Sequence, residues 1–242
     1  VAWRPERRMR VPQAADFVLL PAIARALADA GLPPDAPFDA VGHSSGGLLL
    51  RWLVEHPDAD VDAATPEGFW IGDGRPDGDP LLASRLRRLV LLATPNQGAR
   101  TGIARIACDA YGDLAWRELA CDLVPDAPVL HHLGQRVPLG DGPDYFSIGV
   151  ETLPNLLPAP PFDANGDGVS HSHDNAVAAE SSWLAGAPHR IWRGRHQRSH
   201  FTVSCASTVI GWIVGFLDDG SVPLQAEGPQ PSRDACRGAP DP

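Results

Sequence analysis

A serine set between glycines is the group with the clearest capacity for chemistry in this sequence. Residues 42–46 read G-H-S-S-G, which matches the pattern G-x-S-x-G with Ser44 at its centre. Residues 38–41 before it are typical of a short buried strand, and residues 46–54 after it form an apolar run typical of a helix. A sharp strand-to-helix turn lifts a hydroxyl clear of the sheet, above a helix N-terminus that favours developing negative charge. The spacing predicts that Ser44 is a nucleophile; the alternative is a helix cap formed by Ser44 or Ser45.

Three segments that follow one another in order resemble the α/β-hydrolase family, particularly its bacterial lipases and esterases. Residues 41–47 resemble the family's V-G-H-S-x-G-G, residues 91–98 its T-P-x-x-G strand end, and residues 122–130 its D-L-x-P-x-S-x-F-L stretch. The resemblance runs in register over about residues 17–217. It implies a Ser-His-Asp triad that works through an acyl-enzyme, with the backbone N–H of Ser45 as one donor of the oxyanion hole.

Nine histidines compete for the role of the base, and two of them fit the family's order of serine, acid and then histidine after the last strand. The resemblance favours His200, because residues 216–217, which end an apolar helix, lie at the family's usual distance downstream. His196 is the alternative.

The acid is expected between residues 163 and 174, where two aspartates fit versions of the family's motif. Asp174 is favoured and Asp167 is the alternative. The same stretch also matches part of a calcium loop, with Asp163, Asn165 and Asp167 at its first ligand positions. A carboxylate bound to calcium would not orient a histidine well, so an ordinary turn and no cofactor is the expectation, with calcium as the alternative.

The elements that must position these residues follow from the hydrophobic pattern and alternate between strand and helix. Strands are expected at residues 38–41, 89–93, 145–150 and 190–192, and helical segments at 14–30, 46–54, 101–133, 178–184 and 208–217. This order predicts an α/β, doubly wound and mainly parallel sheet. We expect one α/β-hydrolase domain over residues 1–217, with a helical cap at about 100–135, and a Pro/Gly-rich tail over 218–242. Residues 1–40 leave no room for a full hydrolase's N-terminal strands or its second oxyanion donor, so both are expected to be missing.

Composition excludes several other classes of function. All 20 basic residues are arginine, which rules out Schiff-base chemistry and lysine-dependent phosphate loops. The net charge of −10 argues against nucleic acid as a partner, and no uninterrupted apolar run is long enough to predict a membrane span. The four cysteines allow the pairs Cys108–Cys121 and Cys205–Cys236, which would suit a secreted enzyme; four free thiols in a cytoplasmic protein are the alternative.

These observations predict a serine esterase or lipase of lipid metabolism, acting on small-molecule or lipid esters and touching a lipid interface through its cap. An acyltransferase or thioesterase would use the same triad. A catalytically silent, hydrolase-like binding module is the alternative from another class, since a fold does not prove an activity.

Overall fold

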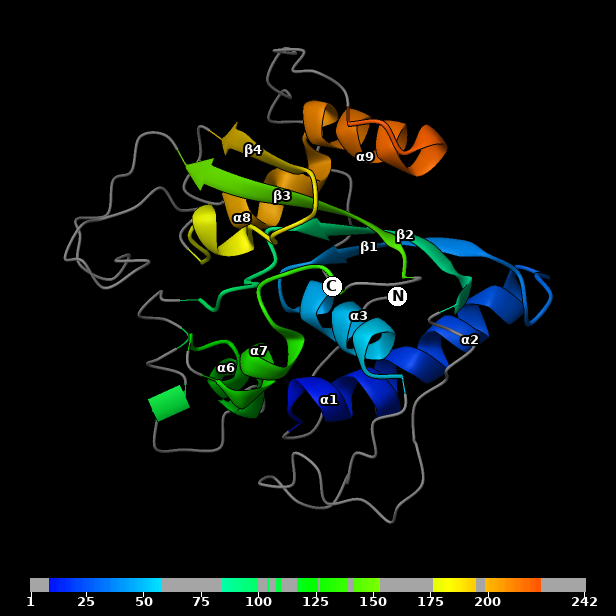
Figure 1. Cartoon of the computed structure of the whole chain (residues 1–242), viewed down its shortest axis with the longest axis horizontal. Helices are drawn as coiled ribbons and strands as arrows, with labels where there is room; N and C mark the ends of the chain where they lie inside the picture. Colours follow the sequence, from blue (N-terminus) through cyan, green and yellow to red (C-terminus); the bar gives the residue numbers. More distant parts are fainter. Residues whose placement is uncertain are drawn as a thin grey trace.

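A parallel sheet forms the centre of the computed structural model, which describes residues 9–57, 84–99, 104, 108–109, 117–125, 127–138, 142–152, 176–194 and 199–222. The strands are β1 (Phe38–His43), β2 (Leu86–Leu92), β3 (Asp144–Thr152) and β4 (His189–Gly194). All three pairings are parallel, in the order β1-β2-β3-β4 (Figure 1). The expected fold class is therefore confirmed. Within the described part of the chain, β1 is an edge strand.

Helices cover both faces of the sheet. Leu89 and Leu91 on β2 pack with Leu50 of α3 (Ser45–Glu55), whereas Val90 and Leu92 face a cluster built with α9 (Ser207–Asp219). Figure 1 shows α3 and α9 on opposite sides of the strands. Burial on both sides explains why β2 reads as an unbroken apolar run rather than an alternating one.

The N-terminal helical run leads into β1 and differs in detail from the single helix expected over residues 14–30. It comprises α1 (Val11–Ala14), a π-helical turn (Ala15–Leu19) and α2 (Leu20–Asp29). Pro21 lacks an N–H and would clash with a carbonyl of the preceding turn in a regular helix, and the wider π turn just before it makes room for the ring. The helix does end where expected: Gly31 has φ 69°, and Leu32 N–H donates to the carbonyl of Leu27, as in a Schellman cap.

The same run, Val11–Asp29, is long and apolar enough to cross a membrane by length and composition alone, with a mean hydropathy of 1.3. This run was not predicted as a membrane span, because polar residues interrupt it and the sequence prediction counted only uninterrupted apolar residues. In the structure Val11 and Ala14 are buried against Leu48 and Trp52 of α3, whereas α2 has no buried residue. The core helix of a soluble protein and a signal sequence near the N-terminus both pass the same test.

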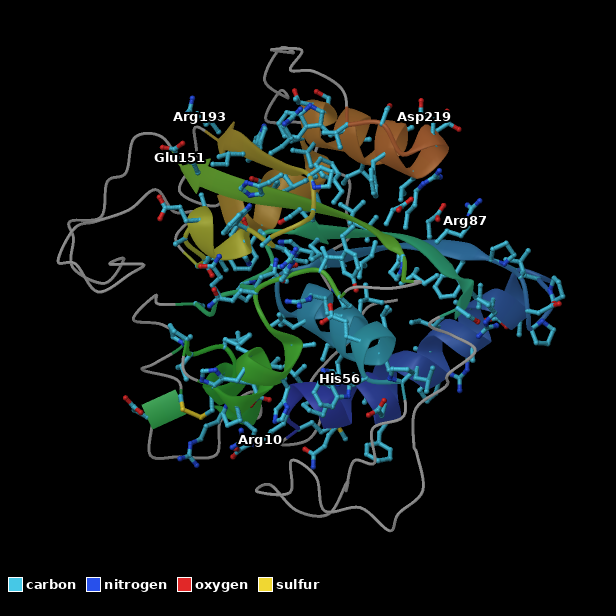
Figure 2. The ribbon with its side chains drawn as sticks, viewed as in Figure 1. Arg10, His56, Arg87, Glu151, Arg193 and Asp219 are labelled. Carbon is cyan, nitrogen blue, oxygen red and sulfur yellow. A yellow bond between two sulfur atoms is a disulfide. The ribbon has the colours of Figure 1, made fainter. Side chains whose placement is uncertain are left out.

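The expected cap is not one helical stretch in its described part. It contains two short helices, α6 (Arg117–Asp122) and α7 (Pro128–Leu133), because Pro125 and Pro128 interrupt regular hydrogen bonding between them. Leu119 is a core residue that packs with α3. The predicted disulfide Cys108–Cys121 is confirmed and drawn as a yellow bond in Figure 2; its expected companion involves Cys236, which lies outside the described residues.

A buried carboxylate ties α6 to the N-terminal helix. Asp122 accepts hydrogen bonds from the backbone N–H of Val11 at 2.6 Å and from the Arg10 guanidinium at 2.8 Å. Figure 2 shows Arg10 at this end of the molecule. Burial raises the pKa of Asp122 to about 6, although the Val11 N–H and the charge of Arg10 act in the opposite direction.

The last elements differ most from expectation. A single 3-10 turn, Glu180–Ser182, stands where residues 178–184 were expected to be helical. Between β4 and α9 lie a four-residue helix, α8 (Ser199–Thr202), and a 3-10 turn, Val203–Cys205. His200 therefore lies on a short helix after the last strand, β4.

Candidate active site

Ser44 occupies a strained turn between β1 and α3. Its φ of 55° and ψ of −132° lie in a region that residues with a Cβ rarely adopt. Such strain costs on the order of 1–3 kcal/mol and persists only where the surroundings hold it. Ser44 N–H donates to the carbonyl of Leu92 at 2.9 Å, which ties the turn to β2. Ser44 occupies the N-cap position of α3, but its side chain makes no capping hydrogen bond.

Two glycines let the helix approach the strand this closely, and the motif's second glycine is not one of them. A Cβ on Gly42 would lie 2.5 Å from the Cα of Gly47, and a Cβ on Gly47 would lie 2.0 Å from the Thr94 hydroxyl oxygen. A Cβ on Gly46 would meet nothing within 4 Å. The close packing of α3 on β1 and β2 therefore depends on Gly42 and Gly47, which lie on either side of the pattern's last glycine.

His200 lies beside the serine, although 156 residues separate them. Its Nε2 is 3.0 Å from the Ser44 hydroxyl oxygen, and only 4% of the histidine is exposed. A neutral imidazole accepts the hydroxyl proton at Nε2 when Nδ1 carries the ring proton. This is the arrangement in which a histidine can take the proton of a serine nucleophile.

The other predicted site residues lie outside the described part of the chain: His196, both acid candidates Asp174 and Asp167, and the remaining calcium candidates Asp163 and Asn165. Their positions in the sequence place the acid candidates between β3 and the 3-10 turn Glu180–Ser182, on the connection that leaves the carboxyl end of β3. Ser45 is the first residue of α3, and the N–H groups of a helix's first turn have no partner within the helix. No cluster of three or more metal-ligating side chains occurs among the residues whose placement is described.

A buried arginine two turns along α3 anchors the helix that carries the serine. Arg51 is completely buried and pairs with Glu55 at 2.7 Å. It also donates to Asn96 and to the carbonyl of Leu133 at the end of α7. Tyr145 donates to Glu55 at 3.1 Å; burial nevertheless raises the pKa of Glu55, because the loss of water outweighs these contacts. The sequence contains a signal for this role of Arg51, which was not predicted: it is the single charged residue within the apolar run of residues 47–54.

A second ion pair lies farther out, where β3 and β4 end. Arg193 donates to Glu151 at 2.8 Å, and Figure 2 shows the two side chains together at this end of the sheet. The arginine side chain is 69% exposed, so solvent screens the pair and it adds little to stability.

The described residues form a parallel sheet with helices on both faces. A serine lies at a strained strand-to-helix turn, and a histidine from the C-terminal part of the chain contacts its hydroxyl. These features agree with the resemblance of the sequence to the α/β-hydrolases. No protein-family model matches the sequence, and no curated protein matches it either.

Similar solved structures include the mature lipase BlEst2 of Bacillus licheniformis, at 13% identity and a TM-score of 0.49, covering 86% of this chain and 75% of that one. The lin2722 gene product of Listeria innocua is 18% identical, with a TM-score of 0.44 and coverages of 89% and 68%. EstA of Clostridium botulinum is 14% identical, with a TM-score of 0.44 and coverages of 78% and 65%.

Proposed function

We propose that this protein is a serine hydrolase of the α/β-hydrolase fold and that it cleaves carboxylic esters. The observation that carries the proposal is the 3.0 Å contact between the Ser44 hydroxyl oxygen and Nε2 of the buried His200, at a turn with a strained backbone. A strained backbone at the nucleophile and a hydrogen bond between nucleophile and base are together typical of acyl-transfer sites.

In the proposed mechanism Ser44 Oγ attacks the ester carbonyl while Nε2 of His200 takes the hydroxyl proton. The C–O bond to the alcohol then breaks, and the imidazolium returns the proton to the leaving oxygen. Water attacks the acyl-enzyme through the same relay and releases the acid. Asp174 is the proposed acid that orients His200, with Asp167 as the alternative, and the N–H of Ser45 is the proposed oxyanion donor.

An apolar acyl group is the substrate feature favoured by the surroundings of His200. Phe201 follows it directly, is 73% exposed, and its ring meets the His200 ring edge-on with centroids 5.3 Å apart. An exposed aromatic ring beside the reacting groups offers apolar surface that an acyl chain can cover. The disulfide Cys108–Cys121 supports a location outside the reducing cytoplasm, as in a secreted protein.

Hydrolysis of p-nitrophenyl acetate, octanoate and laurate tests the proposal. We expect turnover by the wild-type chain and a loss on the order of 10⁴-fold or more in Ser44→Ala. Ser207→Ala is the matched control, because this exposed serine lies at the start of α9 and should leave turnover unchanged. A folded wild-type protein without turnover, or an active Ser44→Ala variant, would contradict the proposal.

The same assay separates the alternatives that use this triad. A thioesterase would prefer a thioester of the same acyl group, and an acyltransferase would pass the acyl group to an added alcohol faster than to water. A catalytically silent module would turn over none of these substrates.

A further inference from the structure

The histidine inside the serine motif touches the segment that carries the base. His43 is the last residue of β1, and its Nε2 lies 2.8 Å from the backbone oxygen of His200. A carbonyl oxygen only accepts hydrogen bonds, so Nε2 of His43 carries the proton and donates it. The two imidazole rings also pack together, with centroids 4.9 Å apart.

We propose that His43 is a positioning residue: its Nε2–H fixes the backbone of His200 at the distance at which the imidazole meets Ser44. The inference rests on the proposed function and adds a residue to it that the motif pattern leaves unspecified. His43 and Ser44 are adjacent, so one rigid turn holds both the nucleophile and the anchor of its base.

The short helix around His200 explains why an outside anchor matters. α8 spans only four residues, and a helix this short is not stable by itself. Its last carbonyl groups have no partner within the helix and must find one elsewhere. The donor from β1 satisfies one of them and connects α8 to the sheet.

Three substitutions separate the hydrogen bond from the ring contact. His43→Phe keeps an aromatic ring against His200 but has no donor. His43→Gln places an amide N–H at the position of Nε2, and His43→Asn places one at the position of Nδ1, which is too short to reach. The proposal therefore ranks glutamine above both phenylalanine and asparagine.

Steady-state kinetics on the best p-nitrophenyl ester provide the first readout. We expect kcat to fall about 10–100-fold in His43→Phe and His43→Asn with KM nearly unchanged, because a base displaced by about 1 Å costs this much. His43→Gln should stay within a few fold of the wild type. Wild-type kcat in His43→Phe, or equal losses in the glutamine and asparagine variants, would overturn the proposal.

Hydrogen exchange gives a readout that does not depend on activity. The backbone amides of residues 199–206 should exchange faster in His43→Phe and His43→Asn than in the wild type and His43→Gln. If the wild-type protein proves inert towards esters, the proposed function fails while this exchange pattern still decides the anchoring. If His43→Phe does not fold, the comparison of glutamine with asparagine carries the test. Equal exchange in these two variants would refute the anchor.

Discussion

Alanine at Gly42 and alanine at Gly46 should have opposite effects, although both glycines belong to the G-x-S-x-G pattern. At position 42 the new Cβ would lie 2.5 Å from the Cα and 2.8 Å from the N of Gly47, and neither backbone atom can rotate away. At position 46 the new Cβ would meet no atom within 4 Å. The pair therefore compares a forced separation of β1 and α3 with a change that disturbs no packing.

The size of each effect follows from these contacts. Ordinary contact begins at 3.4 Å, so Gly42→Ala must push α3 away by about 1 Å, and such overpacking costs roughly 1–3 kcal/mol. For a chain of this size the cost corresponds to a fall in Tm of roughly 2–12 °C. Gly46→Ala should be neutral or stabilise α3 by up to about 1 kcal/mol, since alanine loses less backbone entropy than glycine in a helix.

Thermal unfolding of both variants, followed by circular dichroism, measures the difference, and turnover of a p-nitrophenyl ester measures its consequence for the site. Gly42→Ala should also lower kcat, because a shift of about 1 Å at Ser44 breaks its alignment with His200. A Gly42→Ala variant as stable as the wild type, or a Gly46→Ala variant that loses several degrees, would refute the packing argument.

Two further predictions concern buried charges, and a third concerns the proposed acid of the triad. Arg51→Met leaves Glu55 charged and buried without its partner, so we expect a loss of about 3–5 kcal/mol in the free energy of unfolding, measured with urea. Burial raises the pKa of Asp122 to about 6 from 3.8, so the folded state binds its proton more tightly than the unfolded state. Stability from this group should then rise as the pH falls from about 6 to about 4, and Asp122→Asn should remove that rise in Tm. Asp174→Asn should lower kcat on the order of 10⁴-fold, whereas Asp167→Asn should change it little.

Each of these has a clear contrary result. An Arg51→Met chain with wild-type stability would mean that Glu55 is accommodated without the arginine. An unchanged pH profile in Asp122→Asn would show that its carboxyl titrates alike in both states. A large loss in Asp167→Asn alone would move the acid to that residue.

Local patterns sufficed for the elements whose burial is reflected in their own sequence. The core of β2 is predicted because residues 89–93 are an unbroken apolar run, and Ser44 is predicted because its motif stands between a strand pattern and a helix pattern. The ends of elements were less predictable: β2 begins at Leu86, with two arginines before the apolar run, because pairing with β1 and β3 continues past the buried residues.

Contacts across the fold left no local signal. No residue near His43 in the sequence indicates that it donates to His200, because 157 positions separate the two residues and only the fold brings them together. The pattern marks Gly42 and Gly46 alike, and nothing in it shows that a Cβ clashes at Gly42 whereas the Cβ position of Gly46 is open. The π turn before Pro21 was also not predicted, because a proline usually ends a helix, whereas here the helical run continues through it.

Labelling with a fluorophosphonate probe tests the central arrangement of Ser44 and His200 most directly, because the probe reacts only with a serine whose hydroxyl is activated by a base. Mass spectrometry of the digested protein should find one adduct, on the peptide that contains residue 44, and its rate of formation should collapse in His200→Ala. An intact, folded chain that takes up no probe, or an adduct on another serine, would contradict the account.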